Sequence, residues 1–184
     1  MPVRLYSAPA YAVQEGPERT ETQKPKSDSK SQTLKVTLEL GDGRSISGNI
    51  KFNAPDKITI NHTKNDISYT KVISLQDFSE IQILKWKGTH LRKSKEGEVY
   101  KFNASAFSIK LTNGNLFIIN ENIFPFFEQL QIENSNGQVT LYTFWIDLLR
   151  TDGTWYTGMS GPTSGNRVTC HKDVIKNITF IKDE

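Results

Sequence analysis

Apolar and polar positions alternate along much of the chain after residue 33. In residues 34–40 and 46–52 every second position is apolar or glycine, which is the two-residue period of a half-buried β-strand. The letters GDGR at 41–44 separate the two runs. Because Asp and Gly tolerate the backbone angles of tight turns, this stretch predicts a β-hairpin.

Further strands follow at short intervals. The segments KITINH and DISYTKVISL predict two strands joined by a turn at TKND, and LQDF predicts a short turn or helical loop before a strand through Ile81 and Ile83. Five strands within about fifty residues predict a strongly bent meander, on the scale of an SH3- or Sm-type barrel. We therefore assign residues 33–86 to a first β-barrel module.

The second half of the chain repeats parts of this pattern. The stretch LLRTDGTWYTG carries the same Asp-Gly turn as the first half, and its Gly158 occupies the place of Gly48. Two more hairpins are predicted at Asn113-Gly114 and Asn136-Gly137. The fold prediction is thus all-β, with a second module at 102–184, and a single larger sheet is the alternative. In either case Gly48 and Gly158 are expected to shape the backbone, because glycine lacks the Cβ that crowds a sharp bend.

The first module resembles the Sm-like family, which includes the bacterial Sm-like RNA chaperone. The resemblance lies in VTLELGDGRSISGNIKFNAPDKITI and YTKVISLQDFSEIQI, about fifty residues with a Gly-containing turn and a Gly in the second strand. It implies a bent barrel and, for the family, RNA binding, in some members as a ring. The chain departs from the family at Lys57-Ile58, where a polar pair is usual, and at Gln76-Asp77, where the chaperone has a Lys-His pair. In the second module His171-Lys172 has the reverse order.

Residues 1–32 differ in composition from the rest of the chain. They are rich in Pro, Ser, Thr, Gln, Lys and Glu and lack hydrophobic periodicity, so we expect a disordered tail. Ala8-Pro9-Ala10 follows Arg4 and a few apolar residues and resembles the end of a secretory signal. If residues 1–10 are such a remnant, a periplasmic or secreted location follows; otherwise the expectation is cytoplasmic. No run is long enough to predict a transmembrane segment.

Positive charge is concentrated between residues 84 and 101. The net charge of the chain is only +3, but this stretch contains the expected contact residues for an anionic polymer: Lys85, Trp86, Lys87, His90, Arg92 and Lys93. Basic side chains around an aromatic ring bind phosphates and stack bases. On this interpretation the expected anionic partner is a nucleic acid, a lipid headgroup or a polysaccharide. The alternative is a solvated linker, and we assign 87–101 to a basic linker between the modules.

Two smaller features remain. Phe124, Phe126 and Phe127 predict either a seam in the core or an exposed apolar contact for a protein partner. Cys170-His171 is a weak nucleophile pair, because neighbouring residues on a strand point to opposite faces. The three histidines lack metal-ligand spacing, and we expect no metal, no cofactor and no catalytic residues.

These observations favour a non-enzymatic β-module binding or scaffold protein of a bacterial cell envelope, acting through contacts with an unidentified protein. The alternative is an Sm-like oligonucleotide-binding protein that uses residues 84–101. An enzyme has no supporting residue set in the sequence.

Overall fold

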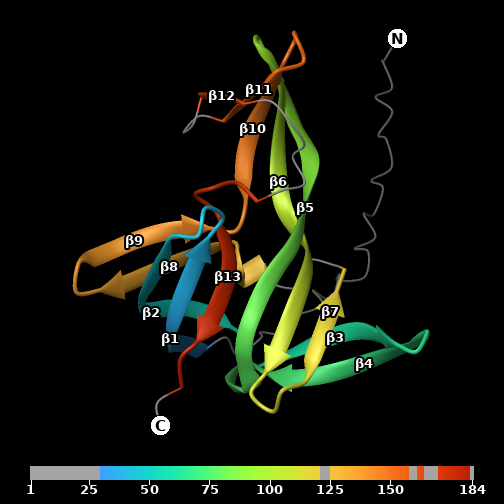
Figure 1. The fold of residues 1–184 in the computed structure, drawn as a ribbon, viewed down its shortest axis with the longest axis vertical. Coiled ribbons are helices and arrows are strands. Elements are labelled where there is room, and N and C mark those ends of the chain that lie inside the picture. The colour runs from blue at the N-terminus through green and yellow to red at the C-terminus, as the bar shows by residue number, and fades with distance from the viewer. Residues whose placement is uncertain (1–29, 121–124, 158–160, 164–169, 183–184) are drawn as a thin grey trace, which may run out of the picture.

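The protein is all-β, as the alternation predicts (Figure 1). A computed structural model describes residues 30–120, 125–157, 161–163 and 170–182. Residues 1–29 of the disordered tail predicted at 1–32, and Gly158, lie outside these residues, whereas residues 30–32 belong to a strand and were wrongly assigned to the tail. Within the described part the strands are β1 (Lys30–Leu40), β2 (Ser45–Ala54), β3 (Lys57–Lys64), β4 (Ile67–Ser74), β5 (Phe78–Ser94), β6 (Gly97–Leu111), β7 (Leu116–Ile119), β8 (Gln129–Asn134), β9 (Gly137–Tyr142), β10 (Trp145–Arg150), β11 (Trp155–Thr157), β12 (Gly161–Thr163) and β13 (Ile175–Phe180). Single 3₁₀ turns occur at Leu75–Asp77 and Pro125–Phe127.

The repeated Asp-Gly motif forms the same turn in both places. Gly43 and Gly153 have φ angles of 88° and 81°, a left-handed conformation that glycine adopts without strain. Each aspartate accepts a hydrogen bond from the backbone N–H two residues later, at Arg44 (3.2 Å) and Thr154 (2.9 Å). The hairpins β1–β2 and β10–β11 that the sequence predicts are therefore confirmed.

Eleven strands form one sheet in the order β12-β11-β10-β6-β5-β13-β1-β2-β8-β9, and β7 pairs with β6 outside this path. The last strand, β13, lies between β1 and β5, so the C-terminal end of the chain completes the sheet begun by the first half (Figure 1). The two sequence ranges thus interleave, which favours the single-sheet alternative. The segment assigned to a linker, 87–101, instead belongs to the long β5–β6 hairpin.

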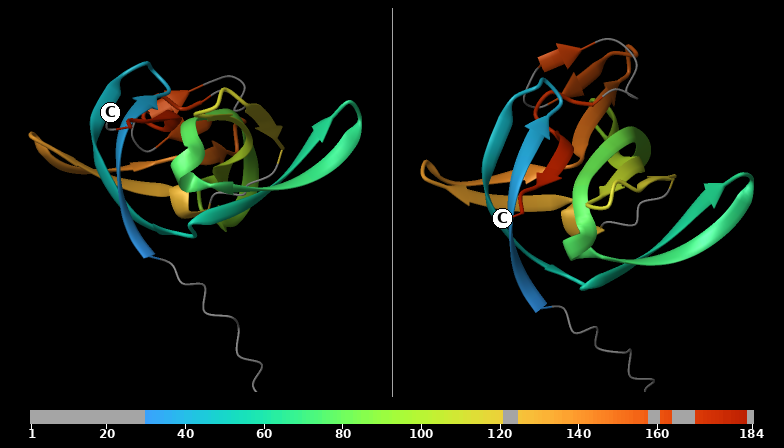
Figure 2. Two further views of the ribbon diagram at one scale, coloured as in Figure 1. Left: turned by 90° about the horizontal axis from the view of Figure 1, so that it is seen from below. Right: turned by 60° about the horizontal axis from the view of Figure 1, so that its bottom comes forward.

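Among the described strands the sheets do not close into the predicted barrels, because the strands at the two ends of this order do not pair with each other. Closure of an Sm-type module requires continuous pairing of its consecutive strands. Here β2 pairs with β1 and β8, whereas β3 and β4 form a separate two-stranded sheet. The two hairpins β3–β4 and β8–β9 project from opposite sides of the curved sheet (Figure 2).

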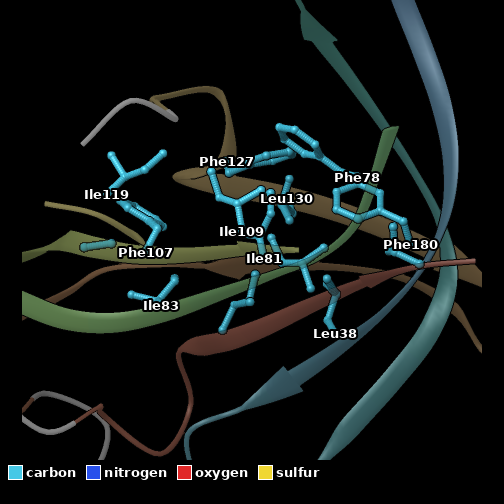
Figure 3. Packing of buried hydrophobic residues seen from close by; sticks show 14 of the residues in the cluster. Leu38, Phe78, Ile81, Ile83, Phe107, Ile109, Ile119, Phe127, Leu130 and Phe180 are labelled. Carbon is cyan, nitrogen blue, oxygen red and sulfur yellow. The ribbon is translucent and has the colours of Figure 1, made fainter. Parts of the chain in front are cut away.

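The buried apolar side chains of the described residues form one core cluster, part of which is seen in Figure 3. Leu38, Ile81 and Ile109 come from three strands of the sheet, and the 3₁₀ turn at Pro125–Phe127 contributes Phe127. Burial of these side chains removes apolar surface from water, which is the main favourable term in folding. The core therefore depends on both halves of the chain.

Candidate functional site

The predicted basic stretch does not form one surface. Trp86 is only 5% exposed, and its indole Nε1–H donates a 2.8 Å hydrogen bond to the backbone oxygen of Thr143. Its ring also lies 5.9 Å from that of Trp145. The expectation that Trp86 stacks on a base is thus wrong, because its ring belongs to the core. Lys85 and Lys87, on either side of it, are exposed.

A β-bulge divides the remaining basic residues. His90 pairs with Tyr100, whereas Arg92 pairs with Val99, so the register shifts by one residue between them. Residues opposite each other in a strand pair share a face. His90 therefore lies on the face that includes Tyr100, Glu98 and Lys93, here called the His90 face. Arg92 lies on the other side, here called the Arg92 face.

The His90 face neutralises much of its own charge. His90 Nε2 lies 2.6 Å from a carboxylate oxygen of Glu98, and Lys93 is the cross-strand partner of the same glutamate. The imidazole also contacts Tyr100 edge to face, with ring centroids 5.4 Å apart. Hence His90 and Lys93 are less available to an anion than the sequence suggests.

The Arg92 face gathers cations from three strands. The register places Lys87 and Arg92 of β5 on the same face as Lys101 of β6 and Arg150 of β10. The guanidinium of Arg150 lies 5.0 Å from the ring centre of Tyr156. Lys101 ends the predicted basic stretch but was not among its expected contact residues, and the β5–β6 pairing places it there. Arg150 lies outside that stretch, and only the pairing of β6 with β10 brings it beside the predicted residues.

One of these cations has an acidic partner. The ammonium of Lys101 lies 3.0 Å from a carboxylate oxygen of Glu128 and 4.0 Å from the ring centre of Phe144. Lys87 and Arg92 are exposed. The Arg92 face thus combines solvated positive charge with aromatic rings.

The phenylalanine cluster belongs mainly to the core. Phe127 is 2% exposed and packs tilted against Phe126, with ring centroids 4.7 Å apart. Phe126 is half-buried. The third member, Phe124, lies outside the described residues. The core interpretation of Phe127 is therefore supported, and the exposed-contact interpretation of that residue is wrong.

An apolar pocket lies beside the first residues of β10; we call it the β10 pocket. Its volume is about 370 Å³. Its apolar lining comes from the end of β9, the connection to β10, the start of β10 and the turn before β13: Tyr142, Phe144, Trp145, Ile146 and Val174. Tyr142 is 40% exposed and Ile146 is 48% exposed, so large apolar side chains meet solvent at this pocket.

The turn before β13 contributes polar groups to the β10 pocket. His171 and Asp173 line it, and Nδ1 of His171 accepts a hydrogen bond of 3.3 Å from the backbone N–H of Asp173. Asp173 in turn accepts a 2.5 Å hydrogen bond from Nη2 of Arg44, which follows the first Asp-Gly turn. The wall formed by residues 171–174 is therefore held by the β1–β2 hairpin.

Backbone contacts support the same wall. The N–H groups of Gly41 and Asp42 donate to the backbone oxygens of Val174 (2.9 Å) and Lys172 (3.3 Å). A Cβ at Gly41 would collide with the backbone oxygen of His171. The first Asp-Gly turn thus supports residues 170–174 through backbone contacts, a role that its sequence does not reveal.

Cys170 and His171 do not form a nucleophile pair. The Cys170 thiol donates to the backbone oxygens of His171 (3.3 Å) and Val174 (3.8 Å), so it is directed into the turn. Burial raises the pKa of Cys170 to about 12, with a small opposing effect from Lys176. Because the thiolate is the reactive form, this thiol is a poor nucleophile at neutral pH.

No cluster of three or more His, Cys, Asp or Glu side chains suited to a metal ion occurs in the described ranges. In the part of the chain that the structure describes, no helix is long and apolar enough to span a membrane.

No protein-family model matches the chain, and neither the curated proteins nor the solved structures yield a match.

Proposed function

We propose that this is a non-enzymatic binding protein that holds another protein through the β10 pocket. The observation that carries the proposal is the pocket's combination of an apolar lining with exposed Tyr142 and Ile146 at its opening. Protein interfaces concentrate their binding energy where a few anchor side chains fill pockets and exclude water from them. The partner is therefore expected to insert an apolar or aromatic side chain.

The volume and chemistry of the pocket fit this role. A space of about 370 Å³ lies at the small end of the range for ligand sites, which is about 300–1,000 Å³. His171 and Asp173 supply hydrogen-bonding groups from the turn before β13, and Thr157 of β11 also lines the pocket. An anchor with an apolar body and one polar atom, such as a Tyr or Trp side chain, matches this arrangement.

Site-specific photocrosslinking tests the proposal in cells. A benzophenone amino acid at Ile146 is expected to give a discrete protein adduct, which is identified by mass spectrometry. The matched control places the same benzophenone amino acid at Leu116, which is 61% exposed on β7. Ile146→Glu should abolish binding of the identified partner in a purified assay, whereas Leu116→Glu should retain it. Equal adducts at both positions, or normal binding by Ile146→Glu, would contradict the proposal.

The second candidate function is binding of a single-stranded oligonucleotide on the Arg92 face. It is favoured by the register that puts Lys87, Arg92, Lys101 and Arg150 on one side of the sheet with Tyr156. Such a surface attracts phosphates, and aromatic rings among cations are typical of sites on which bases stack. The alternative uses Lys87 and Arg92 of the predicted set but not the buried Trp86.

Salt dependence separates the two candidates. The affinity for a labelled oligonucleotide, measured by fluorescence anisotropy, should fall steeply as the salt concentration rises, because contacts to phosphates release counterions. Lys87→Ala/Arg92→Ala should then reduce affinity, whereas Lys93→Ala on the His90 face should have little effect. An affinity that does not change with salt concentration would exclude this site. An equal loss of affinity in Lys87→Ala/Arg92→Ala and in Lys93→Ala would exclude it as well.

The bacterial envelope is the location that we propose from the sequence. Cell fractionation followed by N-terminal sequencing tests it directly. A mature end at Tyr11 would support export, whereas an intact Met1 in the cytosol would contradict it.

A further inference from the structure

Strand β4 presents an exposed edge on the β3–β4 hairpin. Along its eight residues β4 pairs with β3 alone among the described strands. Its outer part is exposed at every position from Ile67 to Val72, with Ile67 at 56% and Val72 at 59%. The hairpin projects away from the curved sheet (Figure 2). The edge is therefore accessible to another strand.

The turn of this hairpin determines which backbone groups remain unpaired. Asn65 and Asp66 both have positive φ, 53° and 61°, and they form a two-residue turn between Lys64 and Ile67. The residues flanking such a turn form a hydrogen-bonded pair, and the pairs then alternate along the strands. Ile67, Tyr69 and Lys71 thus bond toward β3.

It follows that Ser68, Thr70 and Val72 direct their N–H and C=O groups toward the free edge of β4. An incoming antiparallel strand must oppose these residues to form hydrogen bonds. The other strand of the hairpin is less open, because β3 lies next to β7 and His62 packs edge to face on Phe117 at 4.8 Å. The free edge is therefore on β4.

This edge lacks the features that usually prevent strand addition. Soluble proteins protect edges with proline, bulges or outward charges. Strand β4 has no proline, and its register with β3 is regular over all eight pairs. Its one charged residue, Lys71, lies with its ammonium 5.1 Å from the ring centre of Phe117. Such an edge favours pairing with a strand of compatible sequence.

We propose that two copies of this chain pair through β4, antiparallel, with Thr70 of each copy opposite Thr70 of the other. In this register the outward-directed residues meet one another, because Ser68 opposes Val72 of the second copy. Lys71 opposes Tyr69, where an ammonium and an aromatic ring attract each other. The two hairpins then form one continuous four-stranded sheet.

Charge excludes the neighbouring register centred on Lys71. There the two ammonium groups would oppose each other directly, and like charges in that position are destabilising. A register centred on Tyr69 places Lys71 opposite Ile67 and loses the contact with the tyrosine ring. The Thr70 register is therefore the one in which this strand is complementary to itself, which favours a second copy over an unrelated occupant.

Charge reversal at the symmetry axis tests the proposal. The full chain is expected to sediment as a dimer at micromolar concentration, and Thr70→Lys and Thr70→Glu should each sediment as monomers. An equimolar mixture of the two variants should restore a heterodimer, because opposite charges then face each other; native mass spectrometry distinguishes it from either homodimer. Thr63→Lys on β3 is the matched control and should remain dimeric.

The outcomes that overturn the proposal are equally specific. A wild-type monomer at every concentration, dimers that persist in Thr70→Lys, or failure of the mixture to form heterodimers would each exclude it. Circular dichroism should confirm that each variant folds, as expected for substitutions at an exposed residue. Ile146→Glu in the β10 pocket should leave the dimer intact, so this inference is independent of the proposed function.

Discussion

Nη2 of Arg44 lies 2.5 Å from a carboxylate oxygen of Asp173, although the two residues are 129 positions apart in the chain. The same guanidinium contacts Asp42 through Nε at 2.7 Å. One cation thus joins the first Asp-Gly turn to the segment that forms a wall of the β10 pocket. The contact is solvent-accessible, so its main effect is expected on the position of the wall and not on global stability.

Arg44→Ala should loosen residues 171–174. Hydrogen exchange is the measurement: the amides of Gly41 and Asp42, which donate to that segment, should exchange faster than in the wild type. Lys51→Ala is the control, because Lys51 forms a longer exposed contact of 3.8 Å with Glu133 elsewhere on β2. Unchanged exchange at Gly41 in Arg44→Ala would show that the backbone bonds alone hold the wall.

The contact between Asp42 and Arg44 predicts a pH dependence. Desolvation alone would raise the pKa of Asp42, but the hydrogen bonds and charge of Arg44 outweigh it and hold the pKa below the ordinary 3.8. A carboxylate whose pKa is lower in the folded than in the unfolded state stabilises the fold at pH values above its unfolded pKa. This stabilisation is lost as the pH falls through the folded pKa. Protection of Gly41 should therefore be steady near neutral pH and fall below about pH 4 in the wild type only.

Gly48→Ala should destabilise the protein. Gly48 lies beside β8, where β2 and β8 pair at Asn49–Glu133, and a Cβ at this position would collide with the backbone oxygen of Glu133. Because backbone cannot rotate away as a side chain does, we expect a loss of about 1–3 kcal/mol in the free energy of unfolding. Urea denaturation measures it. Ser45→Ala, exposed on the same strand, should change stability by less than about 0.5 kcal/mol.

Local features of the sequence predict hairpins well and sheet order poorly. The turns at Asp42-Gly43 and Asp152-Gly153 depend on neighbouring residues, so their sequence signal is strong. The pairing of Leu38 with Ile178 joins positions 140 residues apart, and both strands show only an ordinary period of two. Nothing local states which strand lies beside β1. Separate modules were therefore predicted, although strands from both ranges share the eleven-stranded sheet.

The candidate surfaces could not be predicted from the sequence, for related reasons. The bulges around Lys85 shift the strand register, so the alternation that would mark Trp86 as buried is interrupted. Lysines on an exposed strand resemble those of a linker, and the β5–β6 hairpin was missed on that basis. The β10 pocket combines Ile146 with Val174, which come together only after β13 joins the sheet. Its lining carries no motif that sequence alone identifies.

Trp86→Phe should cost more stability than its position in a basic stretch suggests. The substitution removes the buried hydrogen bond from Nε1 to the backbone oxygen of Thr143 and leaves that oxygen without this donor. We expect a loss of roughly 1–3 kcal/mol in the free energy of unfolding. Lys87→Ala, at the next residue, should change it by less than about 0.5 kcal/mol. Similar small effects of both substitutions in urea denaturation would contradict the burial of the indole.

The thiol of Cys170 should react slowly in the folded protein. With its pKa raised by burial from 9.0 to about 12, almost no thiolate exists at pH 8, whereas the unfolded chain ionises near pH 9. Alkylation by iodoacetamide at pH 8 should therefore be much faster in urea than in buffer. Equal rates in the two solvents would mean that the thiol is ionised and exposed in the native state.

The same shift lowers stability at high pH. Between about pH 9 and 12 the unfolded chain releases the Cys170 proton while the folded chain retains it, so unfolding becomes more favourable as pH rises. Below pH 9 both states hold the proton and the effect vanishes. Lysines and tyrosines also titrate in this range, so the informative quantity is the difference between wild type and Cys170→Ser. The stability of the wild type should fall more steeply with pH than that of the variant; parallel curves would exclude a buried neutral thiol.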